Sequence, residues 1–440
     1  MKFNNICILG MGYIGLPTAC MFTTNGVNVL GVDIHPAIIE TLNQGRIHIH
    51  EPGLAEAVNT AVAGGLLKAA TTPQPADAFI IAVPTPFYLD DLGEYNGQSY
   101  KKADMRAVTS AARSILPVLR KGNLVVLEST SPPRTTLDLI LPILEESGLK
   151  AGVDFYLAYS PERVLPGQIL RELVENARVI GGIDAASAQA GADLYRAFVK
   201  GEIHQTDSTT AEMVKLMENT YRDVNIAIAN EFSRLSERFG VDVWEAIQLS
   251  SLHPRVKILS PGPGVGGHCI SVDPWFFVET APDLSQLIAK AREVNDGQPH
   301  FVVEKVKQAL GGSLKGKHVA ALGLAYKPDV DDLRESPAVE VVHLLTAAGA
   351  LVKAYEPYKP NADLPGVNAS PTLAGAIEDA DLLLLLVSHS EFKQIDPNKL
   401  LLQTKARIAY DCSNAWKFET WNKVGFVLHR LGDAKNQAPK

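Results

Sequence analysis

The chain has 440 residues, of which 46% are hydrophobic and 20% charged, and its formal net charge is -8. This is the balance of a soluble globular protein with two or three domains, and the lack of a basic block argues against a nucleic-acid partner. The longest apolar runs, such as residues 382–387, are too short to span a bilayer, and no signal-peptide pattern precedes the first strand. We therefore expect an enzyme-like cytoplasmic protein without a membrane partner.

A glycine-rich turn follows the first predicted strand, residues 6–9, and leads into a predicted helix at residues 16–24. Gly10, Gly12 and Gly15 have the spacing of the dinucleotide-binding fingerprint in its strand–turn–helix context. The glycines allow a tight turn, close approach of a pyrophosphate and close helix–strand packing. The alternative is a similar turn on a Rossmann-like sheet that binds another nucleotide.

The second predicted strand, residues 27–32, ends at Asp33. A carboxylate at this position can accept hydrogen bonds from the hydroxyls of an adenosine ribose. The same charge would repel a 2′-phosphate. The sequence therefore favours NAD over NADP.

Two further predicted strands, residues 78–83 and 124–127, are followed by Thr85 and Thr130. In doubly wound sheets, ligands bind beyond the carboxyl ends of the strands, so both threonines are expected at the cofactor. Between them, residues 88–100 are rich in polar residues and glycine, which predicts a mobile loop.

His48 and His50 alternate in a polar stretch. Two histidines without a carboxylate or thiolate partner are more often surface residues than ligands. No metal site is expected.

A predicted strand at residues 156–159 runs into a loop that carries Glu162 and Arg163. Glu162 is a candidate acid or base, and Arg163 is a candidate contact for an anion. From the residues alone, an ion pair between the two at the surface is the more ordinary explanation.

The pattern of residues 208–239 predicts one long helix without proline or internal glycine. Lys215, Asn219 and Arg222 share one face of it among apolar residues, so they need partners, either a substrate or a structural network. A lysine in a partly dry site can exchange protons near neutrality. Asn219 could donate to a developing oxyanion.

Residues 262–273 form a glycine-rich loop that contains Cys269 and Asp273. If the loop runs into a helix, the N–H groups at the helix start favour the thiolate, and Asp273 lies one turn further on. Cys269 is therefore a candidate nucleophile with a nearby acid or base. The alternative is a small buried cysteine in a tight turn. The other cysteines lie in strand or helix patterns, where packing is expected: Cys7, Cys20 and Cys412.

The last part of the chain repeats the organisation of the first. Predicted strands at 319–322, 351–355, 382–387 and 408–411 surround a predicted helix at 337–348. This second α/β unit lacks the three-glycine fingerprint, which argues against a second NAD. Lys327 and Arg334 instead suggest phosphate recognition.

The predicted fold class is α/β, with two Rossmann-like doubly wound domains joined by a central helical domain. We expect an NAD-binding domain at residues 1–205 and a central domain at 206–312 that carries the cysteine loop and mediates dimerisation. A second nucleotide-type domain is expected at residues 313–440.

Together these features indicate one chemistry. An alcohol loses a hydride, the thiolate of Cys269 captures the resulting aldehyde, a second hydride leaves, and water cleaves the thioester. A plain alcohol dehydrogenase does not need the cysteine. A plain aldehyde dehydrogenase does not need the second nucleotide-type domain.

The chain resembles the UDP-glucose/GDP-mannose dehydrogenase family over nearly its whole length. The motifs that carry this likeness are Glu-Met-Val-Lys-Leu-Met-Glu-Asn-Thr (212–220) and Gly-Val-Gly-Gly-His-Cys-Ile (264–270). Further motifs indicate the members that oxidise UDP-N-acetylhexosamines. These are Ser-Pro-Glu-Arg-Val-Leu-Pro-Gly (160–167), Tyr-Arg-Asp-Val-Asn-Ile-Ala (221–227), His-Pro-Arg-Val (253–256) and Val-Asp-Pro-Trp-Phe (272–276).

The resemblance implies a role for each matching residue. Cys269 would be the nucleophile and Lys215 the proton donor or acceptor, Asn219 and Glu162 would assist, and Asp273 would position water. The NAD site would comprise Gly10, Gly12, Tyr13, Ile14, Gly15, Asp33, Thr85, Thr130 and Arg334. The UDP-sugar would be held by Arg163, Val164, Lys215, Asn219, Arg222, His253, Arg255, Gly266, Tyr326 and Lys327.

The implied reaction is the four-electron oxidation of the C6 alcohol of a UDP-N-acetylhexosamine, with UDP-N-acetyl-D-mannosamine as the expected substrate. UDP-N-acetyl-D-glucosamine and UDP-glucose stay open, because no residue decides between C2 epimers. In relatives, the residue matching Arg255 reaches the neighbouring subunit's site, which implies a homodimer or a larger homo-oligomer.

Two alternatives belong to other classes. A non-catalytic NAD-binding regulator would keep the glycine fingerprint but would have no reason to keep Cys269, Lys215 and Asn219 together. A cysteine hydrolase using His268 and Cys269 would not need NAD, and adjacent side chains generally diverge.

Overall fold

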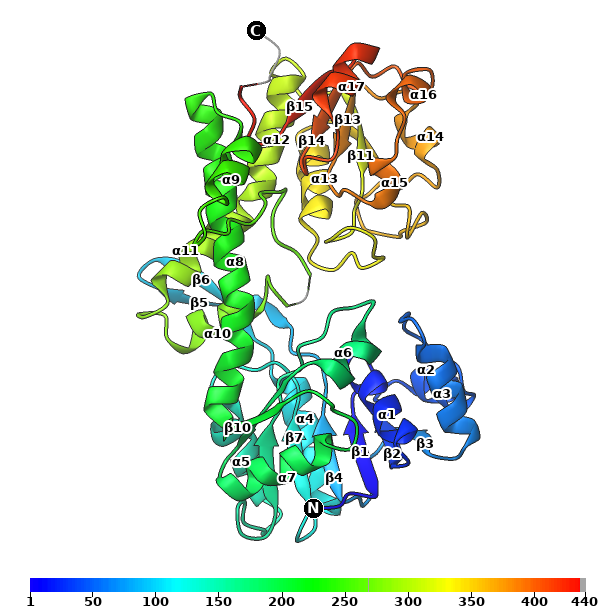
Figure 1. Cartoon of the computed structure of the whole chain (residues 1–440), viewed down its shortest axis with the longest axis vertical. Coiled ribbons are helices and arrows are strands. Elements are labelled where there is room, and N and C mark those ends of the chain that lie inside the picture. Colours follow the sequence, from blue (N-terminus) through cyan, green and yellow to red (C-terminus); the bar gives the residue numbers. More distant parts are fainter. Residues whose placement is uncertain (268, 436–440) are drawn as a thin grey trace. The chain divides into compact units, whose positions relative to one another are not determined.

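The structure is a computed structural model, and it describes residues 1–267 and 269–435. By its internal contacts the chain divides into two units. The first is Met1–Glu218 with Trp275–Leu284, and the second is Asn219–Pro274 with Ser285–Lys440. Helix α8, Ser208–Phe239, begins in the first unit and ends in the second (Figure 1). Among the described residues, no helix has the length and apolar character that crossing a membrane requires.

The first unit is built on an eight-stranded sheet whose neighbouring strands are parallel except β8 and β9. In sheet order the strands are β10 (Ile203–Asp207), β9 (Arg178–Gly182), β8 (Tyr156–Tyr159), β7 (Leu124–Leu127), β4 (Ala78–Ile81), β1 (Asn5–Leu9), β2 (Asn28–Val32) and β3 (Leu67–Ala70). From β3 to β8 this is the 3-2-1-4-5-6 order of dinucleotide-binding folds.

Helices cover both faces of this sheet. They are α1 (Gly15–Thr24), α2 (Pro36–Asn43), α3 (Leu54–Ala63), α4 (Arg106–Ile115), α5 (Leu141–Glu145), α6 (Ile169–Glu175) and α7 (Ala185–Tyr195), with the short turns Leu116–Val118 and Thr136–Ile140. Because side chains alternate along a strand, Ile6 and Ile8 pack in the core cluster that includes residues of α1 and α3. Cys7 and Leu9 pack in the opposite cluster with residues of α4.

The prediction of a mobile loop at residues 88–100 is wrong. The segment forms an antiparallel hairpin of β5 (Phe87–Tyr95) and β6 (Gln98–Ala103). Its two-residue turn is Asn96-Gly97, with φ of 51° and 77°, the geometry for which Asn-Gly is the preferred pair. The hairpin is anchored to α10 (Asp273–Thr280), because the N–H of Ala103 donates to Glu279 Oε2 at 2.8 Å.

The second unit contains a parallel five-stranded sheet. Its strands, in sheet order, are β12 (Leu351–Tyr355), β11 (His318–Leu322), β13 (Leu382–Leu385), β14 (Ile408–Asp411) and β15 (Val427–Arg430). This is the 2-1-3-4-5 order of the other common doubly wound fold. The predicted fold class of two doubly wound sheets with helices between them in sequence is confirmed.

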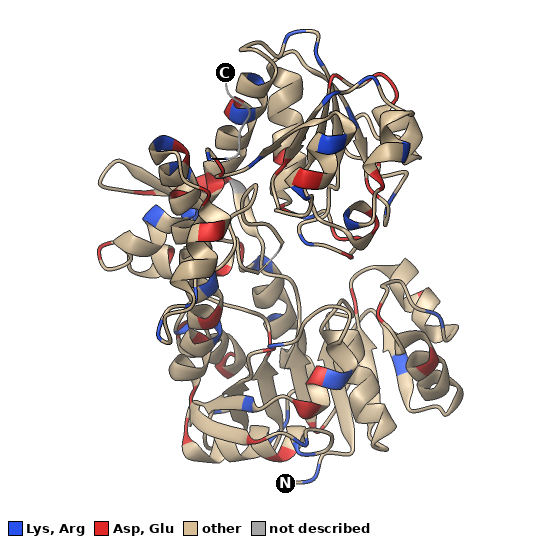
Figure 2. Ribbon diagram, turned by 45° about the horizontal axis from the view of Figure 1, so that its top comes forward, with Lys and Arg blue, Asp and Glu red and all other residues tan. Residues whose placement is uncertain are grey.

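Helices also surround this sheet and precede it in the chain. They are α9 (Val243–Ser250), α11 (Gln286–Asp296), α12 (Gln298–Ala309), α13 (Pro337–Ala347), α14 (Leu373–Ile377), α15 (Ser390–Lys393), α16 (Pro397–Leu401) and α17 (Phe418–Val424). Residues of α12 and α13 share one core cluster with Val319 and Ala321 of β11, while Ala320 and Leu322 face the other. Figure 2 shows Lys and Arg interspersed with Asp and Glu along the ribbons of both units.

Helix α8 has the predicted bounds, but the expectation that its apolar residues are buried is wrong for a stripe of them. Five exposed apolar side chains follow one another at helical spacing: Tyr221, Ile228, Phe232, Leu235 and Phe239. The opposite side of the helix is buried in part. Arg292 of α11 donates to Asp223 of α8 at 2.5 Å, and both side chains are almost wholly inaccessible to solvent.

Candidate active site

The turn between β1 and α1 uses its three glycines in three different ways. Gly10 has φ +97°, and a Cβ there would lie 2.4 Å from the carbonyl oxygen of Ala82. A Cβ at Gly15 would lie 1.9 Å from the carbonyl oxygen of Gly10, whereas one at Gly12 would meet no described heavy atom within 4 Å. The first and third glycines are therefore needed for packing, and the second leaves the main chain open to a ligand.

Asp33 lies at the end of β2 and closes this turn. Its Oδ2 accepts the N–H of Met11 at 3.1 Å, and its Oδ1 accepts that of His35 at 3.0 Å. A carboxylate has about four lone-pair directions, so capacity remains for ribose hydroxyls. No described side chain caps the start of α1, where Ile14 is the N-cap, so the helix start suits a phosphate. These residues fit a dinucleotide.

Thr85 and Thr130 follow neighbouring strands of this sheet, since Ile81 of β4 pairs with Leu127 of β7. Both threonines are half-buried. The two loops are tied together, because Ser129 Oγ donates to the carbonyl oxygen of Val83 at 2.7 Å. The structure thus places the two threonines on adjacent loops at one sheet edge.

The structure overturns the idea that Glu162 and Arg163 form a surface ion pair. Glu162 is buried, and its Oε2 accepts a hydrogen bond from Arg178 at 2.6 Å. Arg163 offers only its main-chain N–H to Glu162 Oε1, at 2.7 Å, and its guanidinium pairs with Glu218 at 3.2 Å. The pairing differs because β9 brings Arg178 behind the loop, and nothing in the local sequence shows this.

Arg178 is the centre of a buried network that sequence reasoning missed. It also donates to Ser160 Oγ at 2.9 Å and to Glu128 Oε1 at 3.2 Å, and it lies 4.2 Å from the ring centroid of Tyr195. Glu128 Oε1 accepts the hydroxyl of Tyr195 at 2.5 Å, while Oε2 is buried with no described partner. Burial raises the pKa of Glu128 to about 7 and outweighs the attraction of Arg178.

Lys215 is half-buried on α8 and reaches the same loop. Its Nζ donates to the main-chain oxygen of Glu162 at 2.8 Å. Val164, two residues further along the loop, is half-buried. The structure therefore brings together Lys215 and Glu162, two of the predicted catalytic residues.

The cysteine loop runs into α10, so the condition stated for the thiolate is met in the sequence of elements. The main-chain oxygen of Cys269 accepts the N–H of Asp273, the first residue of α10, at 2.8 Å. Asp273 is buried, and its Oδ2 accepts a hydrogen bond from Asn219 Nδ2 at 2.5 Å. Cys269 is half-buried. Cys269, Asp273 and Asn219 thus form one connected group.

The glycines of this loop allow it to pack closely against residues 323–336. A Cβ at Gly266 would lie 2.4 Å from the carbonyl oxygen of Glu335, and one at Gly267 would lie 2.9 Å from the ring of Tyr326. The N–H of Gly267 also donates to the carbonyl oxygen of Arg334 at 3.2 Å. The two segments are therefore held in register.

Tyr326 lies close to the cysteine. Burial, followed by the negative charges of Asp332 and Cys269, raises the pKa of Tyr326 to about 12. The ammonium of the half-buried Lys327 lies 5.6 Å from the ring centroid of Tyr326. Arg334 is exposed and pairs with Asp332 at 2.6 Å.

The remaining predicted substrate residues are at the surface. Arg222, His253 and Arg255 are exposed, and the N–H of Arg255 donates to His253 Nδ1 at 3.3 Å. Residue 268, which the hydrolase alternative requires, lies outside the described residues. Within residues 1–267 and 269–435, no group of three or more His, Cys, Asp or Glu side chains is arranged to hold a metal ion.

The other cysteines are in packing environments, as predicted. Cys7, Cys20 and Cys412 are buried, and burial raises the pKa of Cys7 and of Cys20 to about 12. Cys269 is the more accessible of the four thiols.

Comparison with known proteins agrees with this geometry. Residues 4–199 match the NAD binding domain of the UDP-glucose/GDP-mannose dehydrogenase family, residues 209–297 its central domain, and residues 320–418 its UDP binding domain. The chain belongs to the UDP-glucose/GDP-mannose dehydrogenase family. It is an NAD-dependent dehydrogenase of a nucleotide sugar, and the predictions of family, enzyme class and cofactor are confirmed.

Several relatives are similar over nearly their whole length. A UDP-N-acetyl-D-mannosamine dehydrogenase from Methanocaldococcus jannaschii is 47% identical over 98% of this chain and 97% of its own. An NDP-N-acetyl-D-galactosaminuronic acid dehydrogenase from Ralstonia solanacearum is 46% identical over 94% and 97%. The solved UDP-D-ManNAc dehydrogenase from Pyrococcus horikoshii is 40% identical, covers 98% of this chain and 100% of its own, and has a TM-score of 0.89.

Proposed function

We propose that the protein oxidises the C6 alcohol of UDP-N-acetyl-D-mannosamine to the uronic acid. The observation that carries this proposal is the half-buried thiol of Cys269, placed before α10 and joined through Asp273 to Asn219. A nucleophilic cysteine is what distinguishes a four-electron oxidation from a simple alcohol dehydrogenation. Relatives similar in sequence and structure are named for this sugar.

The proposed sequence has two oxidations and one hydrolysis. NAD, when bound, supplies a hydride acceptor for each oxidation. Lys215, positioned by the main chain of Glu162, takes the proton of the C6 hydroxyl as hydride leaves the same carbon. The thiolate of Cys269 then adds to the aldehyde carbon and gives a thiohemiacetal.

Loss of the second hydride and of the hydroxyl proton converts the thiohemiacetal to a thioester. Asp273 positions a water molecule, which attacks the thioester carbon and releases the carboxylate and the thiol. Asn219 contributes a hydrogen-bond donor beside the reacting carbon. In sum, one sugar alcohol and one water give one carboxylate, two reduced nicotinamides and three protons.

We propose the binding roles that the family resemblance implies. For the cofactor the residues are Gly10, Gly12, Tyr13, Ile14, Gly15, Asp33, Thr85, Thr130 and Arg334. For the UDP-sugar they are Arg163, Val164, Lys215, Asn219, Arg222, His253, Arg255, Gly266, Tyr326 and Lys327. The corresponding domains are residues 1–205, 206–312 and 313–440.

We also propose a homodimer. Besides the exposed apolar stripe on α8, the segment formed by α9 and the residues after it exposes Leu249, Leu252 and Val256. Large contiguous apolar surfaces of this kind are typical of protein interfaces. A second copy of the chain is the proposed occupant, because Arg255 lies in this segment and would enter the neighbouring subunit's site. Consumption of NAD and the reduced state expected for the buried thiols favour a cytoplasmic location.

A panel of UDP-sugars tests the choice of substrate. Purified protein is given NAD and a panel of UDP-N-acetyl-D-mannosamine, UDP-N-acetyl-D-galactosamine, UDP-N-acetyl-D-glucosamine and UDP-glucose. The proposal expects the highest kcat/KM for the mannosamine derivative. The galactosamine derivative is included because one relative is named for its acid. A protein that binds NAD and turns over none of the sugars would be the regulator and would contradict the proposal.

A further inference from the structure

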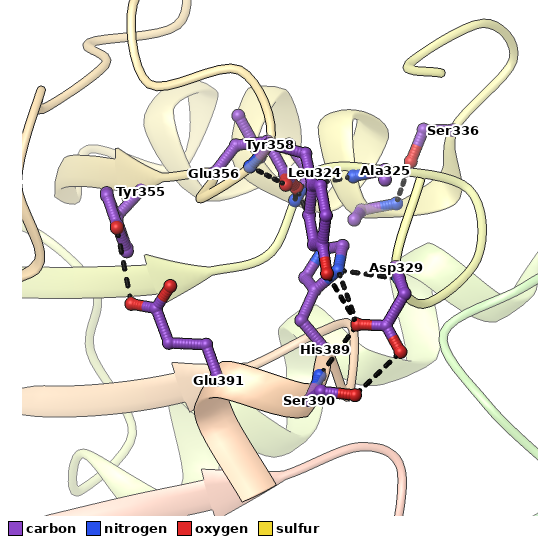
Figure 3. Close-up of polar contacts among 11 residues, drawn as sticks. Leu324, Ala325, Asp329, Ser336, Tyr355, Glu356, Tyr358, His389, Ser390 and Glu391 are labelled. Carbon is purple, nitrogen blue, oxygen red and sulfur yellow. Dashed lines mark hydrogen bonds and ion pairs between the residues drawn. The ribbon is translucent and has the colours of Figure 1, made fainter. Parts of the chain in front are cut away.

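A polar cluster with a buried histidine and a buried glutamate lies at the carboxyl edge of the five-stranded sheet, apart from the groups given roles above. It joins three segments, namely the loop after β11, the residues after β12 and the start of α15 (Figure 3). Its members are Asp329, Glu356, Tyr358, His389 and Ser390 (Figure 3). The loop after β11 is the one that carries Tyr326 and Lys327.

His389 is wholly buried and hydrogen-bonded on both ring nitrogens. Its Nδ1 accepts the N–H of Asp329 at 2.9 Å, so the ring proton lies on Nε2, which donates to Glu356 Oε2 at 3.0 Å. Burial alone would raise the pKa of Glu356, but the hydrogen bond from His389 and the main-chain donors lower it overall. The histidine therefore links an ionised carboxylate to the main chain of Asp329.

Glu356 fixes the start of the loop. Its Oε2 also accepts the N–H groups of Leu324 at 2.7 Å and Ala325 at 3.0 Å. It occupies the place at the end of the second strand that Asp33 occupies in the first unit, where Asp33 accepts the N–H of Met11. In the second unit, His389 donates a hydrogen bond to the carboxylate of Glu356. This carboxylate therefore anchors the loop and does not bind a ribose.

Asp329 fixes the middle of the loop. It has φ +61°, a left-handed conformation that is strained for a residue other than glycine unless its surroundings hold it. Its carboxylate accepts the N–H and the hydroxyl of Ser390, both at 2.8 Å, and the hydroxyl of Tyr358 at 3.1 Å. Together with the bond to His389, these contacts hold Asp329 in this conformation.

The far end of the loop is joined to the cysteine loop. The N–H of Tyr326 donates to the carbonyl oxygen of Asp332 at 3.1 Å, and the carbonyl oxygen of Arg334 accepts the N–H of Gly267 at 3.2 Å. Lys327 lies between Tyr326 and Asp332, the two residues that the first of these bonds joins. A displacement of Asp329 would therefore move the side chains of Tyr326 and Lys327 within a loop that is fixed at both ends.

We infer that His389, with Asp329 and Ser390, positions Tyr326 and Lys327 to bind the diphosphate side of the UDP-sugar. These are positioning residues, since they act through the loop and not on the substrate. The inference rests on the proposed function, which assigns Tyr326 and Lys327 to the substrate. It predicts a specific loss of UDP affinity when the link from His389 to Asp329 is removed.

The test compares two replacements of His389. His389→Gln keeps a donor near Glu356 but removes the acceptor for the N–H of Asp329, whereas His389→Asn keeps an acceptor at the place of Nδ1. An unpaired buried N–H is costly, so His389→Gln should raise the Kd for UDP and the KM for the UDP-sugar about tenfold. His389→Asn should stay within about threefold of wild type. The Kd for NAD and kcat should change little in either variant.

Thr404→Val is the matched control in the same unit. The buried Thr404 donates to the carbonyl oxygen of Ile377 and accepts the N–H of Ala406, away from the loop in sequence. It should lower the Tm as His389→Gln does while leaving the Kd for UDP unchanged. If both variants changed the Kd equally, or if UDP and NAD affinities fell together, His389 would be merely structural.

Ser390→Ala and Asp329→Asn keep the test decisive if His389→Gln does not fold. Asp329 is exposed, and Ser390 Oγ makes a single bond to it, so both variants should fold. Each should raise the Kd for UDP about threefold. An unchanged Kd in both overturns the inference. Wild-type protein that turns over no UDP-sugar would instead contradict the proposed function itself.

Discussion

At the scale of single residues, accessibility separates the four cysteines. Three are enclosed by apolar side chains, and burial disfavours their thiolates, whereas Cys269 lies in a glycine-rich turn before a helix. We predict that iodoacetamide modifies Cys269 before any other cysteine in the folded protein. Peptide mass mapping after brief alkylation measures this, and preferential labelling of Cys7, Cys20 or Cys412 would contradict it.

The same residue supports a second measurement. Cys269→Ala should abolish formation of the uronic acid, because no thioester can form, while the Kd for NAD stays within about twofold of wild type. Calorimetric NAD titration and chromatography of the sugar products give both quantities. Acid formation at the wild-type rate by this variant would remove the thiol from the mechanism.

The raised pKa of Glu128 predicts how the stability of the protein depends on pH. Its raised pKa, about 7, means that the folded protein favours the protonated form more strongly than the unfolded chain does. Its contribution to stability is complete below the unfolded pKa of about 4.5 and is lost as pH rises through about 7. E128Q cannot ionise and should not show this loss.

Urea denaturation of both proteins between pH 5 and 8 tests this. The difference in free energy of unfolding, wild type minus E128Q, should fall as pH rises. A difference that is flat or that increases would show that Arg178 keeps Glu128 ionised throughout. Tyr195→Phe, which removes one donor to Glu128 but no charge, is the matched control and should retain the pH dependence.

At the scale of helices and strands, much of the fold could be predicted from the sequence. The ends of the long helix and of the strands that were predicted lie within about two residues of those observed, as strong periodicity allows, but β3, β9, β10 and β15 were not predicted. The hairpin at residues 87–103 was missed because its polar composition masked a genuine signal, the Asn-Gly turn. The polar composition predicted a loop at this segment, whereas the Asn-Gly pair would have predicted the hairpin that is observed.

The site was predicted in its residue types but not in its pairings. The sequence singles out Lys215, Asn219 and Cys269. Polar groups on an apolar helix face need hydrogen-bonding partners, and a cysteine in a glycine-rich loop is accessible to a ligand. The partnership of Glu162 with Arg178 had no such signal, because β9 pairs with β8 only in the folded sheet. Contacts between strands that are distant in sequence depend on topology, which a local pattern does not contain.

At the scale of the whole molecule, the exposed stripe on α8 predicts the oligomeric state. Phe232→Asp places a charge on that stripe and should convert a dimer to a monomer in light scattering, without changing the Kd for NAD. Glu231→Asp, at an exposed neighbouring position, is the matched control. A wild-type protein that is already monomeric at micromolar concentration would contradict the proposed interface.

Subunit mixing tests whether Arg255 acts across that interface. Arg255→Ala and Cys269→Ala should each be inactive alone. Mixed dimers would contain one complete site, so an equal mixture should recover about a quarter of wild-type activity. No recovery would mean that Arg255 serves its own subunit.

In the proposed mechanism, one enzyme oxidises a sugar alcohol to the acid by a covalent step on Cys269. The most direct measurement is the number of NADH molecules formed per molecule of UDP-N-acetyl-D-mannosamine consumed. We expect two NADH molecules per sugar, with the uronic acid as the sole sugar product and no aldehyde released. One NADH per sugar, with a free aldehyde accumulating, would contradict it.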